Sequence, residues 1–217
     1  MVKVSPLFGT RLEEIKWITR KLDRSKIKGE WHVINSHRRF LMKQIDTFIH
    51  SSINSIIELG CGIGINLFLL AKKFPYVKMI GIDINSSAIR IGNELLKQEG
   101  ITNVKLIIGK VEELLPLLKD KSFDITLTNA FLMYIAPDKF TKILKDIIRI
   151  TRKAIILSEW FAPNVRYMYD RHWVRDYVAM LKEFIPNGSI QIIKYPENCW
   201  EDEKWRKYGY LIIATFD

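Results

Sequence analysis

Short apolar runs alternate along this chain with longer segments in which apolar residues recur every three or four positions. Two apolar runs end at Glu58 and at Asp83, and further runs cover Val104–Ile108, Phe123–Thr128 and Ala154–Leu157. Such runs are typical of strands buried on both faces, and the longer spacing is typical of amphipathic helices. The alternation predicts an α/β fold with a mostly parallel sheet between helices.

Two helical segments precede the first strand, and two strands follow the last helix. Residues 10–22 carry Thr10 as a candidate N-cap with Glu13 three positions later, and residues 36–50 repeat the helical spacing. Near the other end, apolar runs at 190–195 and 210–216 read as strands six and seven. We therefore expect one domain of residues 1–217, with a helical cap at 1–50 and a core at 53–217.

The segment from Ile56 to Phe74 organises the chain. A β-branched run closes at Glu58, and a helical pattern begins at Ile65. Between them lie three glycines on alternate positions, Gly60, Gly62 and Gly64. Strand, tight glycine turn and helix form the nucleotide-binding corner of an open α/β sheet. Here glycines let a ligand approach the backbone, and Asn66 adds a polar side chain where the helix offers free N–H groups.

The glycine spacing argues against two common nucleotide sites. A dinucleotide turn needs a third Gly or Ala, but that slot holds Ile65 or Leu67, depending on where the count starts. The chain also has no G-x-x-x-x-G-K-[ST] run for a phosphate cradle. A dehydrogenase binding NAD is therefore disfavoured.

The run E-L-G-C-G-I-G at residues 58–64 resembles the first motif of class I S-adenosylmethionine-dependent methyltransferases, [DE]-x-G-x-G-x-G. Asp83 closes the second strand 25 positions after Glu58, where one carboxylate can accept hydrogen bonds from both hydroxyls of a ribose. The resemblance covers about residues 53–217. It implies a Rossmann-like αβα sandwich whose seven strands have the order 3-2-1-4-5-7-6, the last one antiparallel, with two extra N-terminal helices.

The resemblance implies S-adenosyl-L-methionine as cofactor and S-adenosyl-L-homocysteine as product. In this family the third strand's end reads the adenine, but the usual Asp after Gly109 is Lys110 here, which leaves Glu112 or the Val111 backbone for that role. An aromatic and a cation of the cap approach the donor's methionine end. The implied donor-binding residues are Glu58, Gly60, Cys61, Gly62, Gly64, Asn66, Asp83, Ile84, Gly109, Lys110, Val111, Glu112, Asn129, Ala130, Trp31 and Arg39.

The end of the fourth strand bears on the acceptor. Asn129 is not followed by the two prolines that mark transfer to a planar amino nitrogen in this family, and neither cysteine lies there to attack a pyrimidine. The run resembles the small-molecule branch, which implies methyl transfer to oxygen or nitrogen. Glu159 and His172 are the candidate proton acceptors, since strand ends point into the crevice and His titrates near neutral pH. Candidate acceptor contacts are Tyr134, Trp160, Arg171 and Arg175, the arginines suiting an anion.

Charge keeps two alternatives open. The net charge is +10, and residues 1–50 hold eleven Lys and Arg against five Asp and Glu. Such a segment can bind RNA, although lysines along helices usually form a solvated face. An RNA or nucleotide methyltransferase is thus one alternative, and a non-catalytic S-adenosylmethionine-binding protein is another. The chain shows no membrane span, secretory leader or metal motif, so we expect a cytoplasmic protein without a metal.

Overall fold

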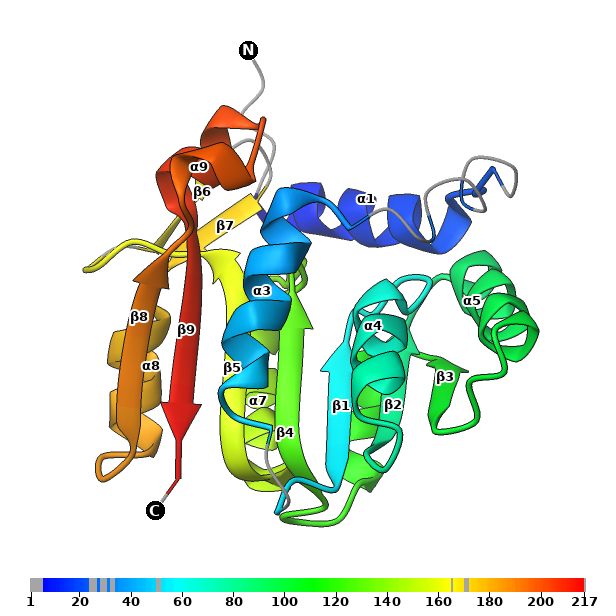
Figure 1. Ribbon diagram of the computed structural model, residues 1–217. Coiled ribbons are helices and arrows are strands. Elements are labelled where there is room, and N and C mark those ends of the chain that lie inside the picture. The colour runs from blue at the N-terminus through cyan, green and yellow to red at the C-terminus, as the bar shows by residue number, and fades with distance from the viewer. Residues whose placement is uncertain are drawn as a thin grey trace.

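The computed structural model of the protein describes residues 6–23, 27, 31, 34–49, 52–164, 166–169 and 172–216, with the backbone alone at 6–11 and 166–169. Its main feature is a seven-stranded sheet of order β3-β2-β1-β4-β5-β9-β8 (Figure 1). The strands are β1 (Ser55–Leu59), β2 (Lys78–Asp83), β3 (Val104–Ile108), β4 (Phe123–Asn129), β5 (Thr151–Trp160), β8 (Ser189–Lys194) and β9 (Gly209–Thr215). Strands β1 to β5 pair in parallel, and β9 is antiparallel to β5 and β8. The predicted order is confirmed, with β8 and β9 as the sixth and seventh strands.

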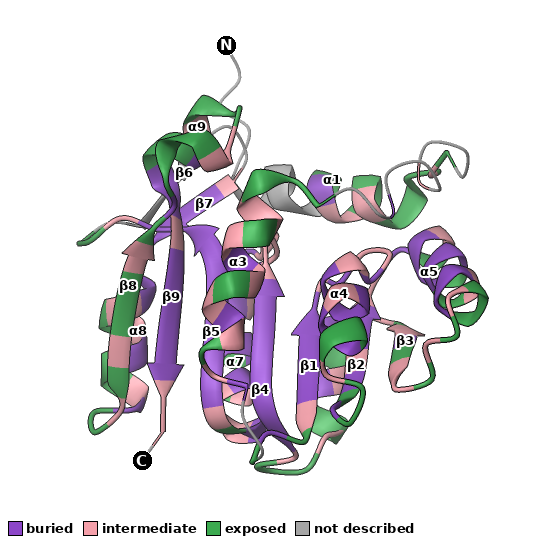
Figure 2. Cartoon of the chain, in the orientation of Figure 1, coloured by how far each residue is buried: buried purple, intermediate pink, exposed green. Residues whose placement is uncertain are grey.

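Helices cover both faces of this sheet. On one face lie α3 (Ser36–Asp46), α4 (Ile65–Lys73) and α5 (Ser86–Gln98), and on the other α7 (Pro137–Ile150) and α8 (Tyr177–Phe184). Neighbouring residues of β1 divide between the two cores, because Ile56 packs with the first set and Ile57 with the second. The central strands are buried along most of their length while the helices expose their outer sides (Figure 2). The predicted three-layer sandwich is therefore confirmed.

Helix α1 (Pro6–Thr19) lies across the end of the sheet to which the parallel strands point (Figure 1). It begins four residues before the predicted start, so Thr10 lies inside the helix and not at its N-terminus. Helix α3 begins after Asn35, whose side chain accepts the N–H of Arg38 at 3.2 Å, and it ends at Asp46 instead of at residue 50. Both predicted helices are therefore present with shifted boundaries.

A hairpin of β6 (Arg166–Tyr169) and β7 (His172–Arg175) was not predicted. It falls in the segment after β5 that contains the candidate proton acceptor His172 and the candidate acceptor contacts Arg171 and Arg175. The remaining short elements are α6 (Val111–Leu114), η1 (Leu115–Leu117), η2 (Leu132–Tyr134), η3 (Glu197–Cys199) and α9 (Glu203–Tyr208). Of these, η2 follows β4 directly and therefore lies beside the strand ends.

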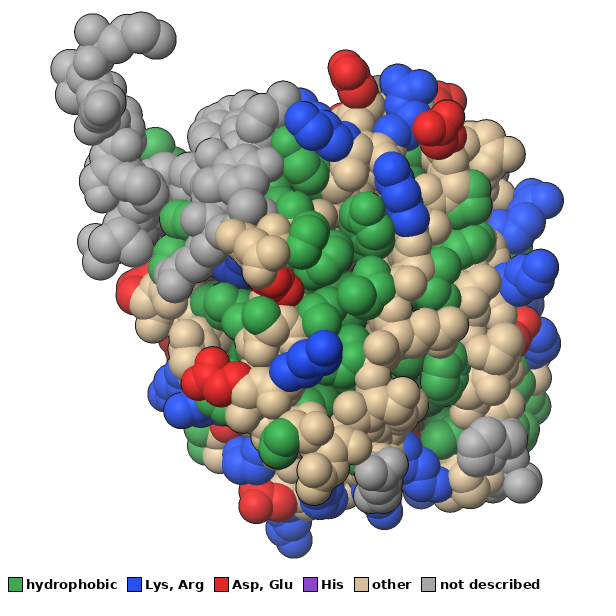
Figure 3. All heavy atoms as spheres, turned by 90° about the vertical axis from the view of Figure 1, so that its left-hand side faces the viewer, with side chains coloured by type: hydrophobic (Ala, Val, Ile, Leu, Met, Phe, Trp, Pro, Cys, Tyr) green, Lys and Arg blue, Asp and Glu red, His purple; other side chains and the backbone are tan. Residues whose placement is uncertain are grey.

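Membrane-spanning helices can be assessed from the described residues, and the distribution of charge from one face of the molecule. Among the described residues, no helix combines the length and the apolar character needed to cross a bilayer. On the face that carries the β8 edge, Lys and Arg side chains are spread singly, with Asp and Glu among them (Figure 3). On this face the positive charge forms a solvated surface and not a single basic patch.

Candidate functional site

A pocket of 830 Å³ lies at the carboxyl ends of β1, β2, β3 and β4. This is where ligands bind in open α/β sheets, and the volume falls within the range of about 300–1,000 Å³ usual for ligand pockets. The predicted residues that line it are Glu58, Gly60, Cys61, Gly62, Asn66, Asp83, Ile84, Gly109, Lys110, Val111, Glu112, Asn129, Ala130 and Tyr134. Residues from four strand ends and the glycine turn therefore converge on one cavity.

Two glycines of the turn are needed for different reasons. Both are in the left-handed region, with φ of 72° at Gly60 and 56° at Gly62. A Cβ on Gly60 would collide with the Phe131 ring, whereas a Cβ on Gly62 would meet nothing within 4 Å. Gly60 therefore allows η2 to approach the turn, and Gly62 leaves open backbone that faces the pocket.

Asp83 is fixed beside this turn. Its Oδ2 accepts the N–H of Gly62 at 2.7 Å and its Oδ1 accepts the N–H of Asn85 at 2.8 Å. Burial raises the pKa of the carboxyl, and these backbone hydrogen bonds oppose the rise. The two oxygens together have about four acceptor positions, so the carboxylate can still accept hydrogen bonds from a ribose.

A buried polar chain starts at the end of β1. Glu58 is 1% exposed, and its Oε1 accepts the Asn66 amide at 2.6 Å. The Oδ1 of Asn66 accepts Nε of Arg38 at 3.0 Å. The other oxygen of Glu58 has no hydrogen-bond partner among the described residues, and burial raises the pKa of Glu58 to about 8. A buried carboxyl oxygen without a partner at a pocket wall fits the ammonium group of a methionine moiety.

The cation at this end is Arg38, one residue before the predicted Arg39. Arg39 is exposed and donates to the carbonyl of Ile34 at 3.4 Å. One residue turns a helical side chain by about 100°, so the phase of α3 decides which arginine faces the pocket. Trp31, the predicted aromatic contact of the donor, instead lies in the core. It is 1% exposed and packs on Phe68 at a ring distance of 4.7 Å.

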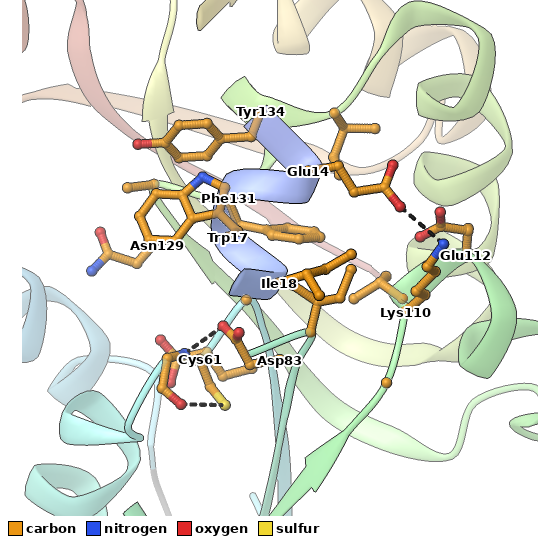
Figure 4. A pocket seen from close by; sticks show the side chains of 18 of the residues that line it. Glu14, Trp17, Ile18, Cys61, Asp83, Lys110, Glu112, Asn129, Phe131 and Tyr134 are labelled. Atoms are coloured by element: carbon orange, nitrogen blue, oxygen red, sulfur yellow. Dashed lines mark hydrogen bonds and ion pairs between the residues drawn. The ribbon is translucent and has the colours of Figure 1, made fainter. Parts of the chain in front are cut away.

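Helix α1 and a cluster of charges close the opposite end. Glu14 forms an ion pair with Lys110 at 3.0 Å (Figure 4). It forms a second with Lys139 at 3.1 Å, and Lys139 also reaches Glu112 at 2.7 Å. The Asn85 amide donates to two carbonyls at the end of α1, those of Trp17 at 2.7 Å and Arg20 at 2.9 Å. The resemblance implied a helical cap over the donor, but no residue of α1 was predicted to line the pocket, because these contacts join residues far apart in the chain.

Aromatic rings form the end of the pocket beyond Asn129. Figure 4 shows Trp17 beside Asn129 and Tyr134, across the pocket from Lys110 and Glu112. Trp17 and Tyr134 make an edge contact with ring centres 5.3 Å apart. His37 and Trp200, which also line the pocket, stack at 3.6 Å. This end suits a partly apolar molecule.

Several predicted residues do not line the pocket. Gly64 is the N-cap of α4, and a Cβ there would meet Leu106. Trp160 is 2% exposed in the core, and His172 lies behind Tyr134 at a ring distance of 4.8 Å. Glu159 and Arg175 are fully buried around η2 and face backbone groups, so the geometry does not support Glu159 as a proton acceptor or Arg175 as an anion contact. Arg171 lies outside the described residues.

Comparisons agree with this geometry. A family model described as a methyltransferase domain matches residues 50–214. A tRNA (guanine-N(7)-)-methyltransferase of Paracoccus denitrificans is 28% identical over 160 residues, which cover 70% of this chain and 63% of that protein. A malonyl-[acyl-carrier protein] O-methyltransferase of Priestia megaterium is 31% identical over 90 residues, or 42% of this chain and 31% of that protein.

A solved structure shares the fold at low identity. An S-adenosylmethionine-dependent methyltransferase from Aquifex aeolicus has a TM-score of 0.60 and 17% identity, with 91% of this chain and 100% of that chain covered. The chain spans less than two thirds of the length of the two curated relatives above. The family match extends over most of the chain and includes the glycine turn, Asp83 and the strand ends around the pocket. The chain belongs to the class I S-adenosylmethionine-dependent methyltransferases.

Proposed function

We propose that this protein transfers the methyl group of S-adenosylmethionine to a small-molecule acceptor, at oxygen or nitrogen. The observation that carries the proposal is the continuity of the pocket from Asp83 and Glu58, past Asn129, to the aromatic end. Bound there, S-adenosylmethionine supplies a methyl group on a good leaving group. Residues 1–217 would act as one domain, with the N-terminal helices covering the site.

Three groups of residues would each bind a different part of the donor. Asp83 would bind the ribose, and the strand end at Gly109–Glu112 would hold the adenine. Glu58, with Asn66 and Arg38 behind it, would bind the methionine end, where the arginine suits the carboxylate. This leaves the sulfur side toward Asn129 and Tyr134.

The aromatic end favours catalysis by positioning over catalysis by a strong base. Burial lowers the pKa of His37 to about 4 and raises that of Tyr134 to about 12, so neither ring takes a proton readily at neutral pH. The acceptor would therefore bring a nucleophile that is already unprotonated, and the protein would align it with the methyl group and exclude water. This replaces the predicted roles of Glu159 and His172.

Calorimetry with S-adenosylhomocysteine and NAD tests the donor assignment. The wild-type protein should bind S-adenosylhomocysteine and not NAD. Gly62→Arg should lose that binding without unfolding, because the side chain would enter open pocket space. Preferential binding of NAD, or full affinity in Gly62→Arg, would contradict the assignment.

A second candidate is an RNA methyltransferase. It is favoured by the basic residues 1–50 and by the name of the relative from Paracoccus denitrificans. Radiolabelled S-adenosylmethionine incubated with a cell extract separates the candidates. Label in the small-molecule fraction supports our proposal, whereas label in RNA, with salt-sensitive RNA binding, supports the second candidate.

A further inference from the structure

The turn that carries Tyr134 is held from both sides by two buried charged residues. The carboxylate of Glu159, at the end of β5, accepts three consecutive backbone N–H groups: those of Phe131 and Leu132 at 3.0 Å and of Met133 at 3.2 Å. These are N–H groups that the start of a helical turn leaves without an internal partner. The carboxylate therefore caps η2 from its N-terminal side.

Arg175, at the end of β7, holds the other side of the same turn. One guanidinium nitrogen donates to the carbonyl of Leu132 at 2.7 Å, and the second donates to the carbonyl of Ile135. The guanidinium also lies over the ring of Phe140, with its carbon 4.3 Å from the ring centre. Both Glu159 and Arg175 are 0% exposed, so both side chains face this turn and not the solvent.

The residue that leads into this turn, Ala130, has a strained backbone conformation. Ala130 has φ of 52°, a conformation that costs a residue with a Cβ some free energy and that persists only where its surroundings fix it. Its N–H donates to the carbonyl of Ser158 at 2.9 Å, which ties it to β5 one residue before Glu159. Ser158 and Glu159, near the end of β5, thus hold the chain immediately after β4.

This turn forms part of the pocket wall on which the acceptor depends. Phe131 packs against Gly60 of the glycine turn, and Tyr134 contacts Trp17 of α1. A shift of η2 would therefore move the ring of Tyr134 and the contact with the donor-binding turn together. We propose that Glu159 and Arg175 are positioning residues that fix the turn 131–135, and with it Phe131 and Tyr134, against the bound donor.

The experiment compares Glu159→Gln with Asp124→Asn as a matched control. Asp124 is likewise buried, at 2% exposure, and accepts the N–H groups of Asn54 and Ser55 at 2.8 and 3.1 Å, but it lies at the opposite end of β4. In Glu159→Gln one carboxylate oxygen becomes an amide that cannot accept an N–H. Hydrogen exchange of the amides of residues 131–133 should speed up about tenfold or more, while Asp124→Asn should leave it unchanged.

Affinity for S-adenosylhomocysteine provides the second measurement, and this arm alone rests on the proposed function. It should fall about tenfold in Glu159→Gln and change less than about twofold in Asp124→Asn, since only the first variant frees the pocket wall. Equal losses in both variants would show a general effect on stability and overturn the proposal. If the wild-type protein does not bind S-adenosylhomocysteine, the donor assignment fails and the exchange data still decide the positioning role.

Two further observations keep the test decisive if Glu159→Gln does not fold. In the wild-type protein, the amides of residues 131–133 should exchange slowly although they lie outside the sheet; rapid exchange there would overturn the proposal. Arg175→Lys keeps the charge but cannot reach both carbonyls in a fork, so exchange at Ile135 and the affinity should change in the same direction, though less. No change in either quantity would contradict the role of Arg175.

Discussion

Glu58 is the residue whose ionisation should matter most to the proposed binding of the donor. Its pKa is raised to about 8 by burial, so the carboxyl is protonated at neutral pH in the protein without donor. The ammonium group of the donor would favour the charged carboxylate and lower this pKa. Binding near pH 7 should therefore release a proton, and affinity should rise as the pH approaches 8.

Calorimetry in two buffers of different ionisation enthalpy measures this proton release. Glu58→Gln should abolish the proton release and flatten the pH dependence of affinity. In the protein without donor, the variant should also lack the loss of folding stability that the wild type shows as the pH rises toward 8. The raised pKa of Glu58 contributes stability that is present below about pH 4.5 and lost as the pH rises through about 8. A wild-type protein that binds the donor without proton release would contradict the role of Glu58.

The pKa of His37 is lowered, whereas that of Glu58 is raised, so its effect on stability has the opposite pH dependence. Burial and the charge of Arg38 lower its pKa to about 4, and the ring stacks on Trp200. A lowered pKa of a base contributes stability that is present above pH 6.5 and lost as the pH falls from 6.5 to 4. His37→Phe keeps the stack, so urea unfolding should show a smaller loss of stability between pH 7 and pH 5 than in the wild type. An identical loss would exclude His37 as the cause.

At the scale of elements, α1 is the cover of the pocket. Its ion pairs with Lys110 and Lys139 are partly exposed, so each contributes at most about 1 kcal/mol and is weakened by salt. Glu14→Gln should speed the dissociation of S-adenosylhomocysteine by a few fold, and high salt should speed it in the wild type. Stopped-flow fluorescence measures both rates.

A matched control for this prediction is Glu99→Gln. Glu99 pairs with Lys72 at 3.2 Å on the outer surface, away from the residues that line the pocket. This variant should leave the dissociation rate unchanged. If Glu14→Gln and Glu99→Gln behave alike, α1 is not held closed by its ion pairs.

The elements also show how far the sequence could predict this molecule. The strands and the glycine turn were predictable because local patterning, turn chemistry and an acidic strand end are all encoded within short segments. The role of Arg38 was missed because it depends on the helical phase of α3. The roles of α1 and Glu159 depend on contacts between residues that are more than 20 positions apart in the sequence. Glu159 looked catalytic because it ends a strand, yet its carboxylate is satisfied by the backbone of η2.

At the scale of the whole molecule, the two cores hold the carboxyl ends of the central strands in place. Alternate residues of the central strands pack into opposite helical layers, so the carboxyl ends of β1, β2, β3 and β4 are fixed relative to one another. The groups that we propose bind the donor, and the aromatic end of the pocket, lie at these strand ends, under α1. The site therefore depends on topology for its place and on loops for its chemistry.

The central claim is tested most directly by a crystal structure of the protein with S-adenosylhomocysteine. The account predicts the ribose on Asp83, the adenine beside Gly109–Glu112 and the amino-acid end near Glu58 and Arg38, with the sulfur facing Asn129. A nucleoside bound elsewhere, or one whose ribose makes no contact with Asp83, would contradict it.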